Sequence, residues 1–188
     1  MTDLAPTILQ AAGLTVPKDM TGQSLIRQLT AQPSGWIDAN RDHIFTGRER
    51  HVQSWPARAI RTTDFLYVRN HAPQTWDMGV GKGELPNYDF TTTPWPTTAP
   101  AFSFNCDPSP TKQWLRRHQK ASPRLNRLAF GVPEPEELYD LKSDPDQLNN
   151  VAKDPIYRDQ RTSLSKRLDH ELDQTKDPRR RQFVPANH

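Results

Sequence analysis

The single cysteine of this chain is a potential nucleophile, and it lies in the sequence FNCDPSPTKQW. A catalytic thiol needs a neighbouring base, a cation or a helix N-terminus to lower its pKa. The nearest charged neighbour of Cys106 is instead Asp107, and a nearby carboxylate raises the pKa of a thiol. We therefore interpret Cys106 as a loop thiol and predict no catalytic residue in this chain.

A second cluster suited to chemistry is the sequence GRERH at residues 47–51, with two arginines, a glutamate and a histidine. A guanidinium binds sulfate, phosphate or carboxylate through two parallel hydrogen bonds. The preceding Ile44 and Phe45 predict a short strand, and α/β folds place binding sites where strands end. The spacing alone leaves two interpretations open, an anion-binding site or a charged loop with internal ion pairs.

Metal and nucleotide sites are not predicted. None of the six histidines is paired with another histidine or with the cysteine at a metal-binding spacing, which argues against zinc. The acidic sequence SDPDQ at residues 143–147 lacks the alternation and the closing glutamate of a calcium loop. A glycine-rich phosphate-binding loop is missing from the sequence as well.

The composition indicates a thin core, because only 34% of the 188 residues are hydrophobic and 18 are prolines. The net charge of +3 requires neither nucleic acid nor a membrane as a partner. The basic sequences LRRHQK (115–120) and DPRRRQ (177–182) are interpreted as solvated faces. No apolar run approaches the roughly 18 residues of a membrane span, and the start lacks the features of a signal peptide.

The first helix and a β-hairpin are the elements that the residue pattern predicts in the first half of the chain. Apolar residues share one face of a helix that Asp3 caps and Gly13 ends, and a second short helix covers 24–30. The sequences ARAIRT (57–62) and FLYVRN (65–70) predict two strands joined by a tight turn.

A third strand, ELYDL (137–141), and a last helix capped by Asp154 complete the predicted fold, and a further helix covers 111–119. We expect the last helix to cover one face of a small antiparallel sheet with its apolar stripe, which consists of Tyr157, Leu164, Leu168 and Leu172. The first helix is expected to lie apart from that core, with these side chains exposed: Leu4, Ile8 and Leu9.

Three parts of the sequence resemble sulfatases. DLAPTILQAAGLTVPKDMTGQSL is similar to the sulfatase segment D-x-x-P-T-L-L-x-x-A-G followed by G-x-S-L. PEPEELYDLKSDPDQLNNVA is similar to E-L-Y-D-L-x-x-D-P-x-E-x-x-N-L-A, near the sulfatase C-terminus. Between them, GRERH, WPARAIRTTDFLYVRN and SPTKQWL occur in the order seen in heparan N-sulfatase (N-sulfoglucosamine sulfohydrolase)-like members. The resemblance extends from about residue 2 to residue 173.

The resemblance implies the C-terminal piece of an alkaline-phosphatase-like α/β hydrolase, which by itself is an α+β fold with a small antiparallel sheet, a C-terminal helix and long irregular loops. In this family a cysteine in C-x-P-S-R becomes formylglycine, which attacks sulfur, and a calcium ion neutralises the sulfate. Both precede the D-x-x-P-T helix. Cys106 follows that helix and has Pro110 at the arginine position, so it does not match the nucleophile.

The chain is therefore expected to be a fragment that is inactive alone, with a sulfated carbohydrate as the substrate of the intact, exported enzyme. The missing N-terminal portion is then an expected partner. Residues 1–55 would end the catalytic domain, and 56–175 would form the C-terminal subdomain with an inserted loop at 71–110. Residues 176–188 would be a disordered tail.

The resemblance also implies that Glu49, Arg50 and His51 lie at the rim of the active site of the intact enzyme. Arg50 would bind an anion of the substrate, while His51 or Glu49 would form hydrogen bonds with sugar hydroxyls. The alternative function is a complete non-catalytic module that binds anionic glycans through Arg48, Arg50 and the basic face.

Overall fold

The computed structural model describes residues 2–32, 38, 41–50, 54–76, 78 and 109–180. The chain divides into two compact units, Met1–Asp42 and His43–His188. The division at residue 55 expected from the sequence refers to the domains of an intact enzyme and stays a prediction. In the described ranges, no helix is long and apolar enough to cross a membrane.

The first unit contains two short helices, α1 (Leu4–Ala11) and α2 (Ile26–Thr30). Gly13 follows the end of α1 with a positive φ of 73°, as expected for a residue that ends a helix. The predicted side-chain cap by Asp3 is wrong, because the backbone of Asp3 is itself helical and a capping residue needs an extended backbone. Its Oδ1 atom instead accepts a hydrogen bond from the backbone N–H of Gln23 at 2.7 Å.

The two sulfatase-like motifs of this unit, D-x-x-P-T from Asp3 and G-x-S-L from Gly22, are in direct contact. The Oγ1 atom of Thr7 accepts a hydrogen bond from the backbone N–H of Leu25 at 2.9 Å. Gly22 lies so close to the backbone carbonyl of Thr2 that a Cβ atom at this position would overlap it. The aspartate and threonine of the first motif and the glycine of the second are therefore explained by contacts within this unit.

The outer face of α1 is apolar and largely uncovered within the first unit. Leu4 is 47% exposed and Ile8 is 67% exposed, as expected from the sequence, whereas Leu9 is half-buried. None of the three belongs to the hydrophobic core that forms around the sheet of the second unit.

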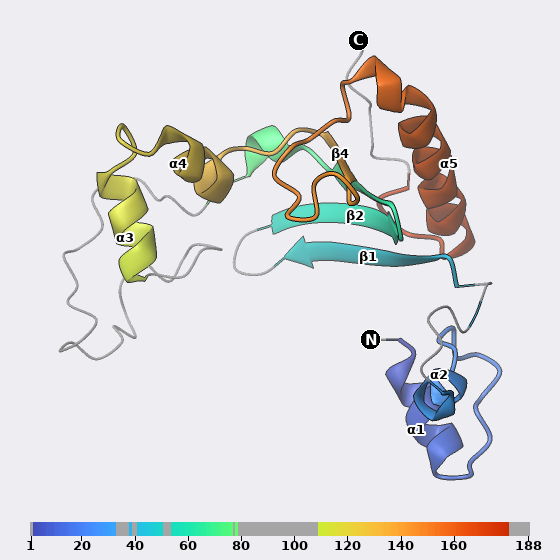
Figure 1. Cartoon of the computed structure of the whole chain (residues 1–188). Coiled ribbons are helices and arrows are strands. Elements are labelled where there is room, and N and C mark those ends of the chain that lie inside the picture. Colours follow the sequence, from blue (N-terminus) through green and yellow to red (C-terminus); the bar gives the residue numbers. More distant parts are fainter. Residues whose placement is uncertain are drawn as a thin grey trace. The chain divides into compact units, whose positions relative to one another are not determined.

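The second unit is built on a four-stranded antiparallel sheet whose strands follow one another in chain order (Figure 1). The strands are β1 (His43–Arg50), β2 (Ser54–Thr62), β3 (Phe65–Asn70) and β4 (Glu136–Asp140). The Oγ1 atom of Thr62 closes the β2–β3 turn by accepting a hydrogen bond from the N–H of Phe65 at 3.0 Å. The hairpin and the third strand predicted from the sequence are confirmed.

Helix α5 (Arg158–Gln174) packs on one face of this sheet (Figure 1). A 3-10 turn, η3 (Pro155–Tyr157), leads into it, and Asp154 accepts a hydrogen bond from the N–H of Ile156 at 3.0 Å. The core consists of a leucine stripe on α5, three opposed strand residues and one alanine that precedes the helix: Leu164, Leu168, Leu172, Ile60, Tyr67, Leu138 and Ala152. The predicted small antiparallel sheet covered by the C-terminal helix is therefore confirmed.

A buried arginine joins the same helix to the sheet. Arg69 on β3 is only 2% exposed, and its Nη1 atom donates a hydrogen bond to Asp169 on α5 at 2.6 Å. Its Nη2 atom donates to the Oγ atom of Ser165 at 2.9 Å. A buried charge must be paired to be tolerated, so this contact fixes the position of α5 along the strand.

In the described parts of the segment between β3 and β4 there are three short helices: η1 (Pro73–Thr75), α3 (Pro110–Arg117) and α4 (Pro123–Phe130). Helix α3 was predicted, whereas α4 was not. Helix α4 lacks the buried apolar face that marks an amphipathic helix, because Leu125 and Leu128 have about half of their surface exposed and only Phe130 is buried. Most of the expected inserted loop 71–110 lies outside the described residues.

The segment after α5 is held to the sheet through residue 179. Asp177 accepts a hydrogen bond from the Nε atom of Arg58 at 2.8 Å, and Arg179 donates to Glu49 at 2.8 Å. These contacts fall in the stretch that was expected to be a disordered tail. The rest of that prediction, residues 181–188, lies outside the described part of the chain.

Candidate functional site

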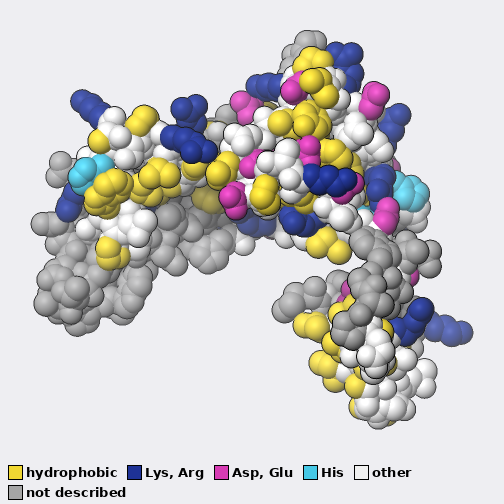
Figure 2. All heavy atoms as spheres, viewed as in Figure 1, with side chains coloured by type: hydrophobic (Ala, Val, Ile, Leu, Met, Phe, Trp, Pro, Cys, Tyr) yellow, Lys and Arg dark blue, Asp and Glu magenta, His cyan; other side chains and the backbone are white. Residues whose placement is uncertain are grey.

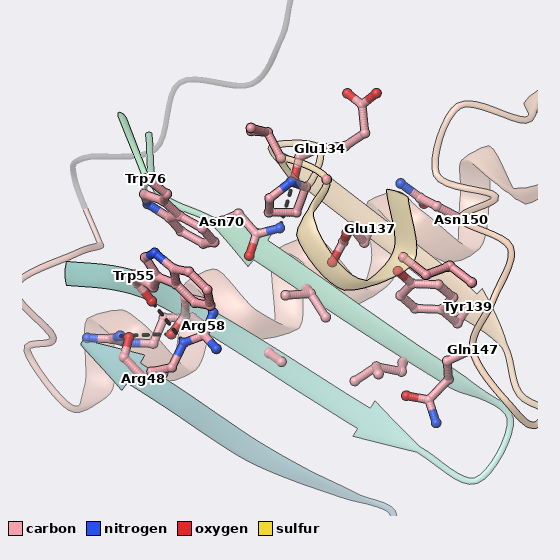
Figure 3. Close-up of a pocket in the computed structure, with 18 of the residues that line it drawn as sticks. Arg48, Trp55, Arg58, Asn70, Trp76, Glu134, Glu137, Tyr139, Gln147 and Asn150 are labelled. Atoms are coloured by element: carbon pink, nitrogen blue, oxygen red, sulfur yellow. Dashed lines mark hydrogen bonds between the residues drawn. The ribbon is translucent and has the colours of Figure 1, made fainter. Parts of the chain in front are cut away.

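The face of the sheet opposite α5 carries a hollow of about 700 Å³ (Figure 3). The strand register creates it, because alternate residues point to opposite faces. Thr46, Ala59, Val68 and Glu137 are successive partners across the four strands, and all four line the hollow. We call this hollow the sheet pocket.

An arginine and two tryptophans form one wall of the sheet pocket. The rings of Trp55 and Trp76 stack with centroids 5.8 Å apart and planes inclined by 15°. The guanidinium carbon of Arg48 lies 5.1 Å from the centroid of Trp55 and 5.7 Å from that of Trp76. Both distances are typical of cation–π contacts. Burial lowers the pKa of Arg48, while the negative charge of Glu137 opposes this effect.

The backbone fixes the position of these three side chains. The Nε atom of Arg48 donates a hydrogen bond to the carbonyl oxygen of Trp55 at 3.0 Å, across the β1–β2 pair. Trp76 follows the turn η1, and its indole Nε1 atom donates to the carbonyl oxygen of His71 at 3.1 Å. Only 7% of Trp76 is exposed, so the wall is rigid rather than a pair of loosely attached rings.

The opposite wall is polar and comes from β3 and β4 (Figure 3). Burial raises the pKa of Glu137, and its hydrogen bonds with Asn70 and Tyr139 counteract that shift. Burial and the charge of Glu137 also raise the pKa of Tyr139. The amide Nδ2 atom of Asn70 donates to the carbonyl oxygen of Glu134 at 2.7 Å. Carboxylate, amide and phenol groups side by side are suited to hydrogen bonds with hydroxyl groups.

The pocket therefore combines a cation on an aromatic surface with a polar wall. Such an arrangement binds a ligand that has an anionic group, hydroxyl groups and an apolar face. Across the described ranges, no group of three or more His, Cys, Asp or Glu residues is placed to hold a metal ion. Cys106 lies outside the described residues.

The predicted site GRERH does not follow a strand, because β1 extends through Arg50. The antiparallel pairing with β2 continues to Arg50 opposite Ser54, with an irregularity between Arg48 and Arg50, so the polar residues are part of the sheet edge. Local sequence did not show this, since a run of four polar residues resembles a loop until a partner strand is present. His51 lies outside the described residues.

Glu49 points to the α5 side of the sheet and takes part in ion pairs. Its carboxylate accepts from Arg58 at 2.5 Å and from Arg179 at 2.8 Å. The hydrogen bond from Arg179 lowers the pKa of Glu49 most, and the one from Arg58 adds to this effect. Of the predicted residues, Arg50 is an exposed side chain of β1, while its neighbour Arg48 is the one that lines the sheet pocket.

Trp55, Trp76 and Glu137 were not identified from the sequence. Glu137 lies inside the predicted third strand. The alternation of side chains along β4 places Glu137 on the face of the sheet opposite to that of the buried Leu138. The pairing of Trp55 with Trp76 has no sequence signal, because 20 residues separate them and a turn decides their contact.

Known proteins resemble this chain in sequence and in fold. The chain matches no protein-family model. It is 29% identical over 174 residues to an ulvan-active sulfatase of Formosa agariphila, a match that covers 90% of this chain and 24% of the relative. The chain is thus similar in sequence to the C-terminal quarter of sulfatases. A second ulvan-active sulfatase of the same organism is 26% identical over 172 residues, covering 88% of this chain and 27% of the relative.

Solved structures support the same fold. A 2-O GAG sulfatase matches with a TM-score of 0.53 and 21% identity, over 98% of this chain and 27% of its own. A protein solved with its substrate D-glucosamine-2-N,6-O-disulfate matches with a TM-score of 0.52 and 20% identity, over 94% and 24%. The four-stranded sheet with its packed helix thus matches the C-terminal part of sulfatase structures. This chain spans about a quarter of the length of these relatives.

Proposed function

We propose that this chain is the C-terminal part of a sulfatase that cleaves sulfuric esters or sulfamates of a sulfated glycan, and that it recognises the glycan rather than cleaving it. The observation that carries the proposal is the chain-long similarity to ulvan-active sulfatases. The sheet pocket supports it, because a cation on two indole rings beside a polar wall fits a sulfated sugar.

Cleavage at sulfur requires an activated nucleophile and a charge that stabilises the leaving sulfate. The resemblance implies formylglycine and calcium for these tasks. The described residues of this chain do not fit a calcium site, because they contain no cluster of three or more acidic or histidine ligands. The proposal therefore assigns both groups to the part of the intact enzyme that precedes the D-x-x-P-T helix.

The proposed roles in this chain concern specificity. Arg50 binds an anion of the substrate at the active-site rim, and His51 or Glu49 forms hydrogen bonds with sugar hydroxyls. The ion pairs of Glu49 with Arg58 and Arg179 give that carboxylate a fixed orientation, which suits directional contact with a hydroxyl. The finer proposal is a heparan N-sulfatase-like preference, supported by the order of the middle motifs between Gly47 and Leu115.

The test uses the full-length enzyme, with Arg50→Ala and His51→Ala made separately. We expect each variant to lose kcat/KM at least tenfold on N-sulfoglucosamine while keeping its rate on a small aryl sulfate. Arg61→Ala is the matched control, because Arg61 is an exposed arginine at the other end of the neighbouring strand. Unchanged kcat/KM on both substrates in both variants would contradict the recognition role.

Two further measurements separate this proposal from a complete glycan-binding module. The purified chain should not release sulfate from a chromogenic sulfate ester in the presence of calcium. Release of sulfate would contradict the proposal that this chain recognises the glycan without cleaving it. The genomic sequence directly upstream of Met1 should encode a C-x-P-S-R motif, in frame or in a shifted frame. A promoter and ribosome-binding site in that place would favour the module.

A further inference from the structure

Helices α3 and α4 carry several exposed basic residues and no acidic ones, a feature that the sheet pocket does not explain. Six basic residues and no acidic ones lie between residues 108 and 133, although the whole chain has 25 basic and 22 acidic residues. The rest of the chain is therefore net acidic. Four of the six are exposed, Arg117, Lys120, Arg124 and Arg127, whereas Arg116 is half-buried and Lys112 is buried. We call the segment 109–131 the basic hairpin.

The spacing of these charges is fixed by hydrogen bonds within the basic hairpin. The Oγ atom of Ser109 caps α3 by accepting from the N–H of Lys112 at 3.1 Å. The backbone N–H of Ser122 donates to the carbonyl oxygen of His118 at 2.8 Å, which closes the turn between the helices. The amide of Asn126 donates to the carbonyl oxygen of Leu115 at 3.3 Å and ties α4 to α3.

The basic hairpin also presents an aromatic surface. Trp114 is 48% exposed, and its ring stacks on that of His118 with centroids 4.4 Å apart. On the face drawn in Figure 2, blue and yellow side chains lie over these helices, with no magenta among them. Cations beside an exposed indole suit a ligand in which sulfate groups alternate with sugar rings.

The hairpin borders the sheet pocket, because Arg127 and Leu128 of α4 line it. Gly131 ends α4 in a tight turn, since a Cβ atom there would lie 2.5 Å from the carbonyl oxygen of Arg127. A glycan residue in the sheet pocket would therefore have the cations of α4 directly beside it. The continuity of the two surfaces favours a polymer longer than the single sugar that the pocket holds.

We propose that the basic hairpin binds the chain of a sulfated glycan outside the residue that is cleaved. The anion's identity rests on the proposed function, whereas the binding surface rests on the charge, exposure and position of α3 and α4. Because the attraction is electrostatic and lies on the surface, binding weakens steeply as the salt concentration rises.

The test measures binding of the purified chain to a size-defined heparin oligosaccharide by titration calorimetry at two salt concentrations. The hairpin variant combines Arg117→Ser, Lys120→Ser and Arg124→Ser, three exposed residues that do not line the sheet pocket. The matched control combines Arg27→Ser, Arg158→Ser and Lys166→Ser, which are also exposed and remove the same charge. We expect a loss of affinity of at least tenfold in the hairpin variant and less than threefold in the control, with unchanged circular dichroism in both.

Equal losses in the two variants would show attraction to net charge alone and would overturn the proposal. Tighter binding of duplex DNA or of phosphatidylserine vesicles than of heparin, lost in the hairpin variant, would also overturn it. Desulfated heparin should not bind. In the full-length enzyme the hairpin variant should raise KM for the polymer and leave the monosaccharide unaffected. Failure of the proposed function would instead appear as an absence of sulfate release by the unaltered enzyme.

Discussion

Asn150→Ala is the substitution whose effect on stability follows most directly from the structure. The Oδ1 atom of Asn150 accepts hydrogen bonds from the backbone N–H of Leu138 at 2.9 Å and of Ala152 at 3.0 Å. Its Nδ2 atom donates to the carbonyl oxygen of Glu136 at 3.1 Å. The side chain thus continues the pairing of β4 where no fifth strand follows it in the described sheet.

The magnitude follows from counting these bonds. Two of them are partly buried, and each is worth about 1 to 1.5 kcal/mol net, while the third is exposed and water replaces it at little cost. We therefore expect Asn150→Ala to lower the free energy of unfolding by about 2 to 3 kcal/mol. Urea denaturation followed by tryptophan fluorescence and circular dichroism measures this difference.

Asn149→Ala is the matched control. Asn149 has the same side chain and is also exposed, but it contributes its backbone N–H, which donates to Asp144 at 2.8 Å and survives the substitution. We expect a change below about 0.5 kcal/mol. Equal effects of the two substitutions would refute the hydrogen-bond argument, because exposure alone does not distinguish the two residues.

Three further outcomes are expected. Burial, and then the charges of three arginines, lowers the pKa of His71 to about 4, so the imidazole is protonated at a lower pH in the folded chain than in the unfolded chain. Stability contributed by neutral His71 is complete above about pH 6.5 and falls between about pH 6.5 and 4, which urea titrations at stepped pH should show; an unchanged slope in His71→Gln would contradict this. Gly22→Ala should destabilise the first unit by about 2 kcal/mol or more, because the added methyl overlaps the carbonyl of Thr2, and hydrogen exchange of α1 should report it. Leu168→Ala should cost about 3 kcal/mol in denaturation experiments while Leu125→Ala costs under about 0.5, since their exposures are 1% and 50%; similar costs would contradict the assigned core.

The site could be predicted only in part. The motif GRERH drew attention to β1, and Arg48 is the charged residue of this motif that lines the sheet pocket. The alternation of β1 decides this, because neighbouring residues of a strand point to opposite faces. Glu49 consequently meets Arg58 and Arg179 on the α5 side. A partner 130 positions away in the chain cannot be read from the spacing of a five-residue motif. The assignment of Glu49, Arg50 and His51 to the rim of the active site stays a prediction.

The sequence by itself determined the elements whose signals are local. The β2–β3 hairpin follows from two apolar strands and a two-residue link, and α5 follows from a capping Asp154 and leucines at helical spacing. Only the tertiary structure decided the pocket, because Arg48, Trp55, Trp76 and Glu137 come from separate segments that the antiparallel register brings to one face. Local periodicity depends on neighbouring residues along the chain, whereas a binding surface depends on how the strands pair and which face the helix covers.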